Sequence, residues 1–150
     1  MSIRIVHTCG EIPESTLSEF EKYFGGRLPP DFREFLLAHN AREIEPGTLP
    51  VTSVPGNPTV AVKELCCFCK GQSCDYYYIF KKFYSRIPPG FIPIARDPGG
   101  NLFIMSLNET ERGAVYFWEH EAEADEGDPP SLDNIYKVAE SFNDMINRLI

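Results

Sequence analysis

The stretch from Ile92 to Trp118 constrains the fold more than any other part of the sequence. Three apolar segments are separated by an Asp-Pro-Gly-Gly turn and by a polar loop; the segments are residues 92–95, 101–107 and 114–118. Proline and glycine at the central turn positions suit a tight reversal of the chain. Consecutive strands with short connections predict an antiparallel meander. The middle segment is almost wholly apolar, so we expect it to be buried on both faces.

The meander should place Asp97 and Asn101 close to the segment 118–121. A histidine between carboxylates, as His120 would be there, can serve acid–base chemistry. An enzyme would also need a nucleophile or a metal, an oxyanion site and a substrate pocket, and the sequence offers no clear candidate for these. Asp97 and Asn101 are explained as turn residues, and Trp118 on an apolar strand is expected to be core. We therefore predict no catalytic residues and no enzyme.

Helices are expected on both sides of an irregular middle region. The first should start at Thr16, with Glu19 completing a capping box, and end at Gly25-Gly26. The remaining expectations are a helix from Pro29-Pro30, a short strand near 49–54 within the Pro- and Gly-rich segment 44–58, a strand at 59–65 and an aromatic-rich helix at 75–86. The segment Ser131–Glu140 is open between helix and strand, and Ser141 with Asp144 resembles a helix cap.

Several short motifs follow one another along the chain. They are Leu28-Pro29, Asp31-Phe32, Phe35-Leu36, Ile94-Ala95, Asp97, Gly99-Gly100-Asn101, Val115-Tyr116-Phe117-Trp118, His120 and Ala139-Glu140-Ser141-Phe142. In this order and spacing the chain resembles the SUKH superfamily, in particular the branch named after a yeast cell-wall assembly regulator, from about Thr16 to Leu149. It departs from the family pattern at Glu119, where an aspartate is usual. It also departs at Asn40-Ala41, where Asn-Gly is usual and the loss of glycine weakens the case for a left-handed cap.

The resemblance implies an α+β fold, with a twisted, mainly antiparallel sheet and helices packed against it. We expect residues 1–150 to form a single domain. Bacterial members of the superfamily are commonly immunity proteins, which implies a non-enzymatic protein that binds a cognate toxin, often a nuclease, and covers its active site. Two alternatives remain open: a regulatory scaffold like the eukaryotic relatives, and a small metal-binding or hydrolytic enzyme.

The negative charge lies in the last third of the chain. Residues 97–150 hold 12 acidic and 3 basic residues, whereas residues 1–96 hold 10 acidic and 11 basic residues. An acidic surface repels nucleic acid and attracts a basic protein, although acidic loops also serve solubility alone. The partner-binding residues that we predict are Asp97, Gly100, Asn101, Glu119, His120, Glu121, Glu123, Asp125 and Glu126. The expected partner is a basic toxin, with no direct contact to nucleic acid or membrane.

Four of the five cysteines fall within nine residues. Cys66, Cys69 and Cys74 are the metal-ligand candidates, but a structural zinc site usually has two ligand pairs well apart in sequence, and the second pair is missing unless Cys67 turns round or a distant histidine joins. We therefore expect reduced thiols, no essential metal and no cofactor. Residues 1–7 contain no signal-peptide run, and no stretch approaches a membrane span, so we expect a cytoplasmic protein.

Overall fold

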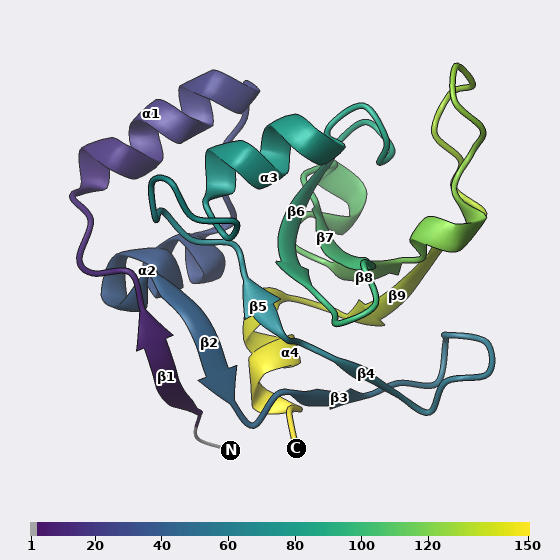
Figure 1. Ribbon diagram of the computed structural model, residues 1–150, viewed down its shortest axis with the longest axis horizontal. Helices are drawn as coiled ribbons and strands as arrows, with labels where there is room; N and C mark the ends of the chain where they lie inside the picture. Colours follow the sequence, from purple (N-terminus) through teal and green to yellow (C-terminus); the bar gives the residue numbers. More distant parts are fainter. Residues whose placement is uncertain (1–2) are drawn as a thin grey trace.

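The computed structural model describes residues 3–150, and its largest sheet is the predicted meander extended by one strand at each side (Figure 1). The first two residues of the N-terminal segment assessed for a signal peptide lie outside this range. The sheet is antiparallel throughout, in the order β5 (Glu64–Leu65), β6 (Phe91–Arg96), β7 (Leu102–Ser106), β8 (Val115–Trp118) and β9 (Ile135–Ala139). All five residues of β7 are buried, which confirms the expectation for the middle segment.

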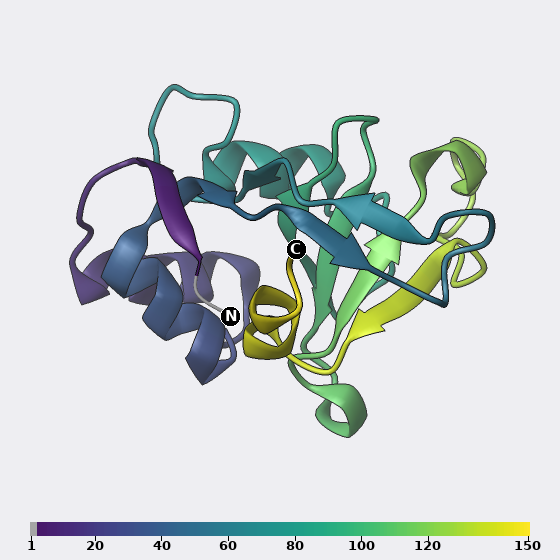
Figure 2. The ribbon, with the colours of Figure 1, turned by 90° about the horizontal axis from the view of Figure 1, so that it is seen from below.

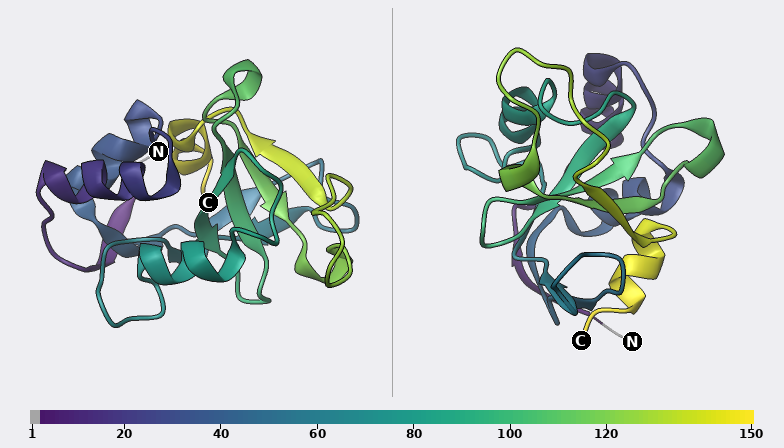
Figure 3. Two further views of the ribbon diagram at one scale, coloured as in Figure 1. Left: turned by 90° about the horizontal axis from the view of Figure 1, so that it is seen from above. Right: turned by 90° about the vertical axis from the view of Figure 1, so that its right-hand side faces the viewer.

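Two antiparallel ribbons flank this sheet. One pairs β1 (Arg4–Thr8) with β2 (Ala41–Glu45), and the other pairs β3 (Thr48–Pro50) with β4 (Thr59–Ala61). The four helices are α1 (Glu14–Phe24), α2 (Pro30–His39), α3 (Tyr76–Phe83) and α4 (Phe142–Asn147), and the short 3₁₀ turns are η1 (Glu109–Glu111) and η2 (His120–Ala122). The predicted α+β class, a mainly antiparallel sheet with packed helices, is confirmed, and the twist of the sheet is visible in Figure 3.

Aromatic side chains join the helices in pairs. Phe20 of α1 lies 4.4 Å from Tyr76 of α3 between ring centroids, and the Tyr76 hydroxyl donates to the Pro93 carbonyl of β6. Phe32 of α2 lies 4.9 Å from Phe142 of α4. Figure 2 shows α4 between α2 and β9, in agreement with this contact. The helices therefore pack against the meander and not against one another alone.

Strand register explains why distant residues meet at one end of the meander. Leu102 of β7 pairs with Trp118 of β8, and Trp118 pairs with Ile135 of β9. Asn101 therefore lies beside the residues that follow Trp118, and residue 134 lies on their other side. This end of the sheet carries the long 119–134 connection, which protrudes at the upper right of Figure 1.

Four local expectations need correction. Helix α1 starts at Glu14, two residues before the predicted capping box, after Pro13, which makes no side-chain cap. Ribbon β1–β2 was not predicted. The expected strand 59–65 is divided into β4 and β5. Asn40 adopts the left-handed conformation itself, with φ 40°, so the missing glycine does not remove the cap of α2.

The C-terminal segment settles the open choice at Ser131–Glu140. Residues 135–139 form strand β9, as the family resemblance favoured. Ser141 caps α4, because its hydroxyl accepts from the Asp144 N–H at 3.0 Å, as predicted. Among residues 3–150, the structure contains no helix with the length and apolar character that a membrane crossing requires.

Candidate functional site

The turn between β6 and β7 is organised by one carboxylate. Oδ1 of Asp97 accepts from the N–H groups of Gly99 (2.9 Å) and Asn101 (2.7 Å), and Oδ2 accepts from the Asn101 side-chain amide (2.9 Å). The expectation that Asp97 and Asn101 act as turn residues is confirmed by these bonds. A carboxylate committed to three hydrogen bonds is poorly placed to act as a general base.

The same turn holds the start of η2 against the sheet. The Asn101 side-chain oxygen accepts from the His120 N–H at 3.0 Å, and His120 Nε2 donates to the Gly99 carbonyl at 2.8 Å. Gly100 has φ +91°, and a Cβ there would lie 3.3 Å from His120 Nε2. The sequence therefore brings Asp97, Gly100, Asn101 and His120 together as predicted. The Asp97 carboxylate and the His120 ring both form hydrogen bonds that hold the turn in place.

A pocket of about 280 Å³ opens beside this cluster. Its acidic lining residues are Asp97, Glu119 and Glu121, and His120 is its one titratable nitrogen side chain. Within residues 3–150, neither Glu119 nor Glu121 takes part in an ion pair. The pocket is therefore a negatively charged hollow with free carboxylates.

Sequence reasoning missed two contributions to this pocket. Strand β4 forms one wall with Thr59, Val60 and Ala61. Asn134, which is 1% exposed, holds Glu119 from the other side. Its side-chain amide nitrogen donates to the Glu119 carbonyl at 2.9 Å, and its backbone carbonyl accepts from the Glu119 N–H at 3.0 Å. A local pattern does not reveal either contribution, because both depend on the packing of distant segments.

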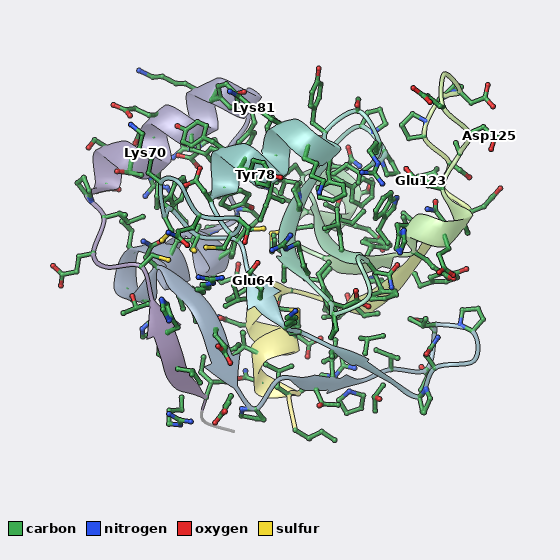
Figure 4. The ribbon with its side chains drawn as sticks, viewed as in Figure 1. Glu64, Lys70, Tyr78, Lys81, Glu123 and Asp125 are labelled. Carbon is green, nitrogen blue, oxygen red and sulfur yellow. The ribbon has the colours of Figure 1, made fainter. Side chains whose placement is uncertain are left out.

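The acidic loop after η2 forms a second, separate hollow of about 740 Å³. Glu123 does not present a free charge there, because Arg86 binds it through two hydrogen bonds of 2.7 and 3.1 Å. The Arg86 guanidinium in turn lies 5.5 Å from the ring of Trp118, which is fully buried, as expected for a core residue. Glu123 therefore anchors the loop, and Asp125 is exposed farther along it (Figure 4). Glu126 is also exposed.

The cysteines are arranged differently from the predicted ligand set. Cys66 is buried but lies outside the group formed by Cys74, Cys67 and the distant Cys9, whose ligand atoms all lie within 4.8 Å of one another. Burial raises the pKa of the Cys66, Cys67 and Cys74 thiols and raises that of Cys9 to about 12. A raised pKa disfavours the thiolate, which is the nucleophilic form of cysteine.

The architecture is that of a small α+β protein with acidic residues along one edge. This acidic edge consists of Glu119 and Glu121 at the pocket and of Asp125, Glu126 and Asp128 on the loop that follows. Residues 11–148 match the SMI1/KNR4 family (SUKH-1), and the chain belongs to this family. The family includes immunity proteins and is generally non-enzymatic. The chain is also similar to the SPbeta prophage-derived uncharacterized protein YokK of Bacillus subtilis (strain 168). The two are 24% identical over an alignment 148 residues long, and the alignment covers 89% of this chain and 72% of the relative.

Proposed function

We propose that this chain is an immunity protein that binds a basic toxin domain through its acidic edge and neutralises the toxin by covering its active site. Family membership supports a protein-binding role. The observation that carries the proposal is the pocket at the end of the meander, where the free carboxylates of Glu119 and Glu121 flank a rigid turn. The hydrogen bonds around Asp97 fix this surface before binding, so little conformational entropy is lost on association.

The pocket suits a basic side chain of the partner as an anchor. Its carboxylates supply acceptors that an Arg or Lys side chain can reach, and charge-assisted hydrogen bonds of this kind are the stronger ones. A few buried anchors usually dominate the affinity of a protein interface. We assign that role to the pocket, and we assign electrostatic steering to the exposed carboxylates of Glu121, Asp125, Glu126 and Asp128.

The same geometry argues against catalysis at this site. The Asp97 carboxylate and the His120 ring are both engaged in holding the backbone, and neither is paired with a nucleophile. The mechanism is therefore occlusion, in which the bound protein blocks access of substrate to the toxin. This agrees with a family that is generally non-enzymatic.

Co-expression tests the proposal directly. The toxin domain encoded by the adjacent reading frame would be expressed in a host with this chain, with the variant Glu119→Gln/Glu121→Gln, or with no second protein. We expect full growth with the wild-type chain, weaker growth with the variant, and growth arrest with no second protein. Equal growth arrest with and without the wild-type chain would contradict the proposal and would favour the scaffold alternative.

A further inference from the structure

Three thiols from two distant parts of the chain converge beside the β1–β2 ribbon, and a fourth thiol lies two residues from one of them on the same loop. The sulfurs of Cys9, Cys67 and Cys74 lie within 4.8 Å of one another, and Cys9 Sγ is 3.1 Å from Cys67 Sγ. Cys69 follows Cys67 by two residues on the same loop and is half-buried, like Cys9. In the part of the chain that the structure describes, the first three are the one group of His, Cys, Asp or Glu residues whose ligand atoms converge this closely.

The backbone around the thiols is fixed by hydrogen bonds. Asn40 is fully buried, and its amide nitrogen donates to the carbonyls of Gly10 (2.9 Å) and Phe68 (3.0 Å), while its oxygen accepts from the Phe68 N–H (2.8 Å). One side chain thus joins the residue after Cys9 to the residue between Cys67 and Cys69. Such supporting contacts around a ligand set orient it for metal binding.

The loop that carries the other ligands closes on itself. The Cys67 N–H donates to the Cys74 carbonyl (3.2 Å), and the Cys69 N–H donates to the Asp75 carboxylate (3.0 Å). These bonds fold residues 67–75 into a tight loop, on which the cysteines have the spacing Cys67-x-Cys69-x4-Cys74. Figure 4 shows sulfur atoms gathered beside the loop that carries Lys70. The second ligand pair that the sequence lacked is therefore supplied by Cys67 and by Cys9, 58 residues away from it.

We propose that Cys9, Cys67, Cys69 and Cys74 bind one structural Zn²⁺ ion. Thiolate sulfur is a ligand that zinc prefers, and tetrahedral coordination with Zn–S bonds of about 2.3 Å places the sulfurs about 3.8 Å apart. For Cys9, Cys67 and Cys74, the observed separations require shifts of about 1 Å or less to reach this geometry. Cys67 and Cys74 are buried while Cys9 and Cys69 are half-buried, which leaves an entry path from one side.

The proposed metal–thiolate centre would be negatively charged. Four thiolates and one Zn²⁺ carry a net charge of about −2. Zinc at this position would tie the end of β1 to the β5–α3 loop, and metal binding free energy would add to folding stability.

Metal content, thermal unfolding and thiol state test the proposal together. The full chain would be reduced, incubated with Zn²⁺ alone, desalted and measured for zinc per chain and for Tm with and without chelator. Cys9→Ser and Cys74→Ser remove a ligand, and Cys66→Ala is the matched control, since Cys66 is equally buried but outside the cluster. Cys9 is half-buried near the N-terminus, so its variant should fold even if Cys74→Ser does not.

We expect one zinc per chain in the wild type and in Cys66→Ala, a Tm that falls on chelation, and zinc affinity at least tenfold weaker in Cys9→Ser. Absence of zinc uptake by the reduced wild type would overturn the proposal. Uptake that is equal in both ligand variants would place the metal elsewhere and also overturn it. A chain without zinc whose mass shows two fewer hydrogens, and whose Tm falls with reductant, would identify a disulfide in place of the metal.

Discussion

Trp118→Ala is the sharpest test of how the core supports the acidic edge. The indole is fully buried at the end of β8, packs edge-on against Phe83 at 5.9 Å, and lies under the Arg86 guanidinium that holds Glu123. Truncation of a fully buried aromatic side chain costs about 3–5 kcal/mol because it leaves a cavity. For a domain of this length each kcal/mol corresponds to about 2–4 °C, so Tm should fall by roughly 6–20 °C.

Calorimetry and urea titration measure this cost, and Tyr78→Ala is the control because Tyr78 is 51% exposed. We expect the control to change the free energy of unfolding by roughly 0.5 kcal/mol or less, as is usual for surface positions. A Trp118→Ala protein with wild-type Tm that fails to bind its partner would refute the reasoning. Trp118 would then belong to the interface and not to the core.

Two further substitutions test the electrostatics and the turn. Burial favours the neutral form of Glu64, but hydrogen bonds from Arg96 and Arg42 outweigh burial and lower its pKa. A lowered carboxyl pKa stabilises the fold above the unfolded value of about 4.3, and this contribution is lost as pH falls through the folded value. The unfolding free energy of Glu64→Gln should therefore fall less than that of the wild type between about pH 5 and pH 3, and parallel urea-derived curves would contradict this. Gly100→Ala should cost about 1–2 kcal/mol, because φ is +91° and the new Cβ would press on the His120 ring; an unchanged urea midpoint would show that the turn relaxes freely.

Local chemistry explains what the sequence could predict. The turn at 97–100 and the apolar runs around it determine the meander, and the Asp97 bonds follow from the preference of aspartate for its own turn backbone. Ribbon β1–β2 left no such signal, because four of the five residues in Arg4–Thr8 are exposed. The sequence did not decide between helix and strand for segment 135–139. Three of its five residues are only half-buried, so the alternation of apolar and polar residues that marks a strand is weak there.

The parts of the site that were missed depend on long-range packing. Strand β4 reaches the pocket from a separate ribbon, and Cys9 reaches Cys67 across 58 residues. The predicted binding residue Glu123 had no local sign of its partner, Arg86, 37 residues earlier in the chain. Spacing rules describe neighbours along the chain, so they grouped Cys66 with Cys69 and Cys74 and could not show that Cys9 lies beside Cys67.

The association rate of the chain with its toxin domain, measured across a salt series, tests the central claim most directly. The acidic-edge variant would neutralise Glu121, Asp125, Glu126 and Asp128, which are exposed, and would leave Glu123 bound to Arg86. A control with the same charge change would neutralise the exposed residues Glu11, Glu19, Glu34 and Glu43. Exposed charges act mainly on the association rate and add little stability.

We predict that the acidic-edge variant associates more slowly than the wild type, by about tenfold at low salt, and with a flatter dependence on ionic strength. The control should keep most of the wild-type rate, and both variants should keep the wild-type Tm. An acidic-edge variant that associates as fast as the wild type, with the same salt dependence, would contradict the account and move the interface to another face of the molecule.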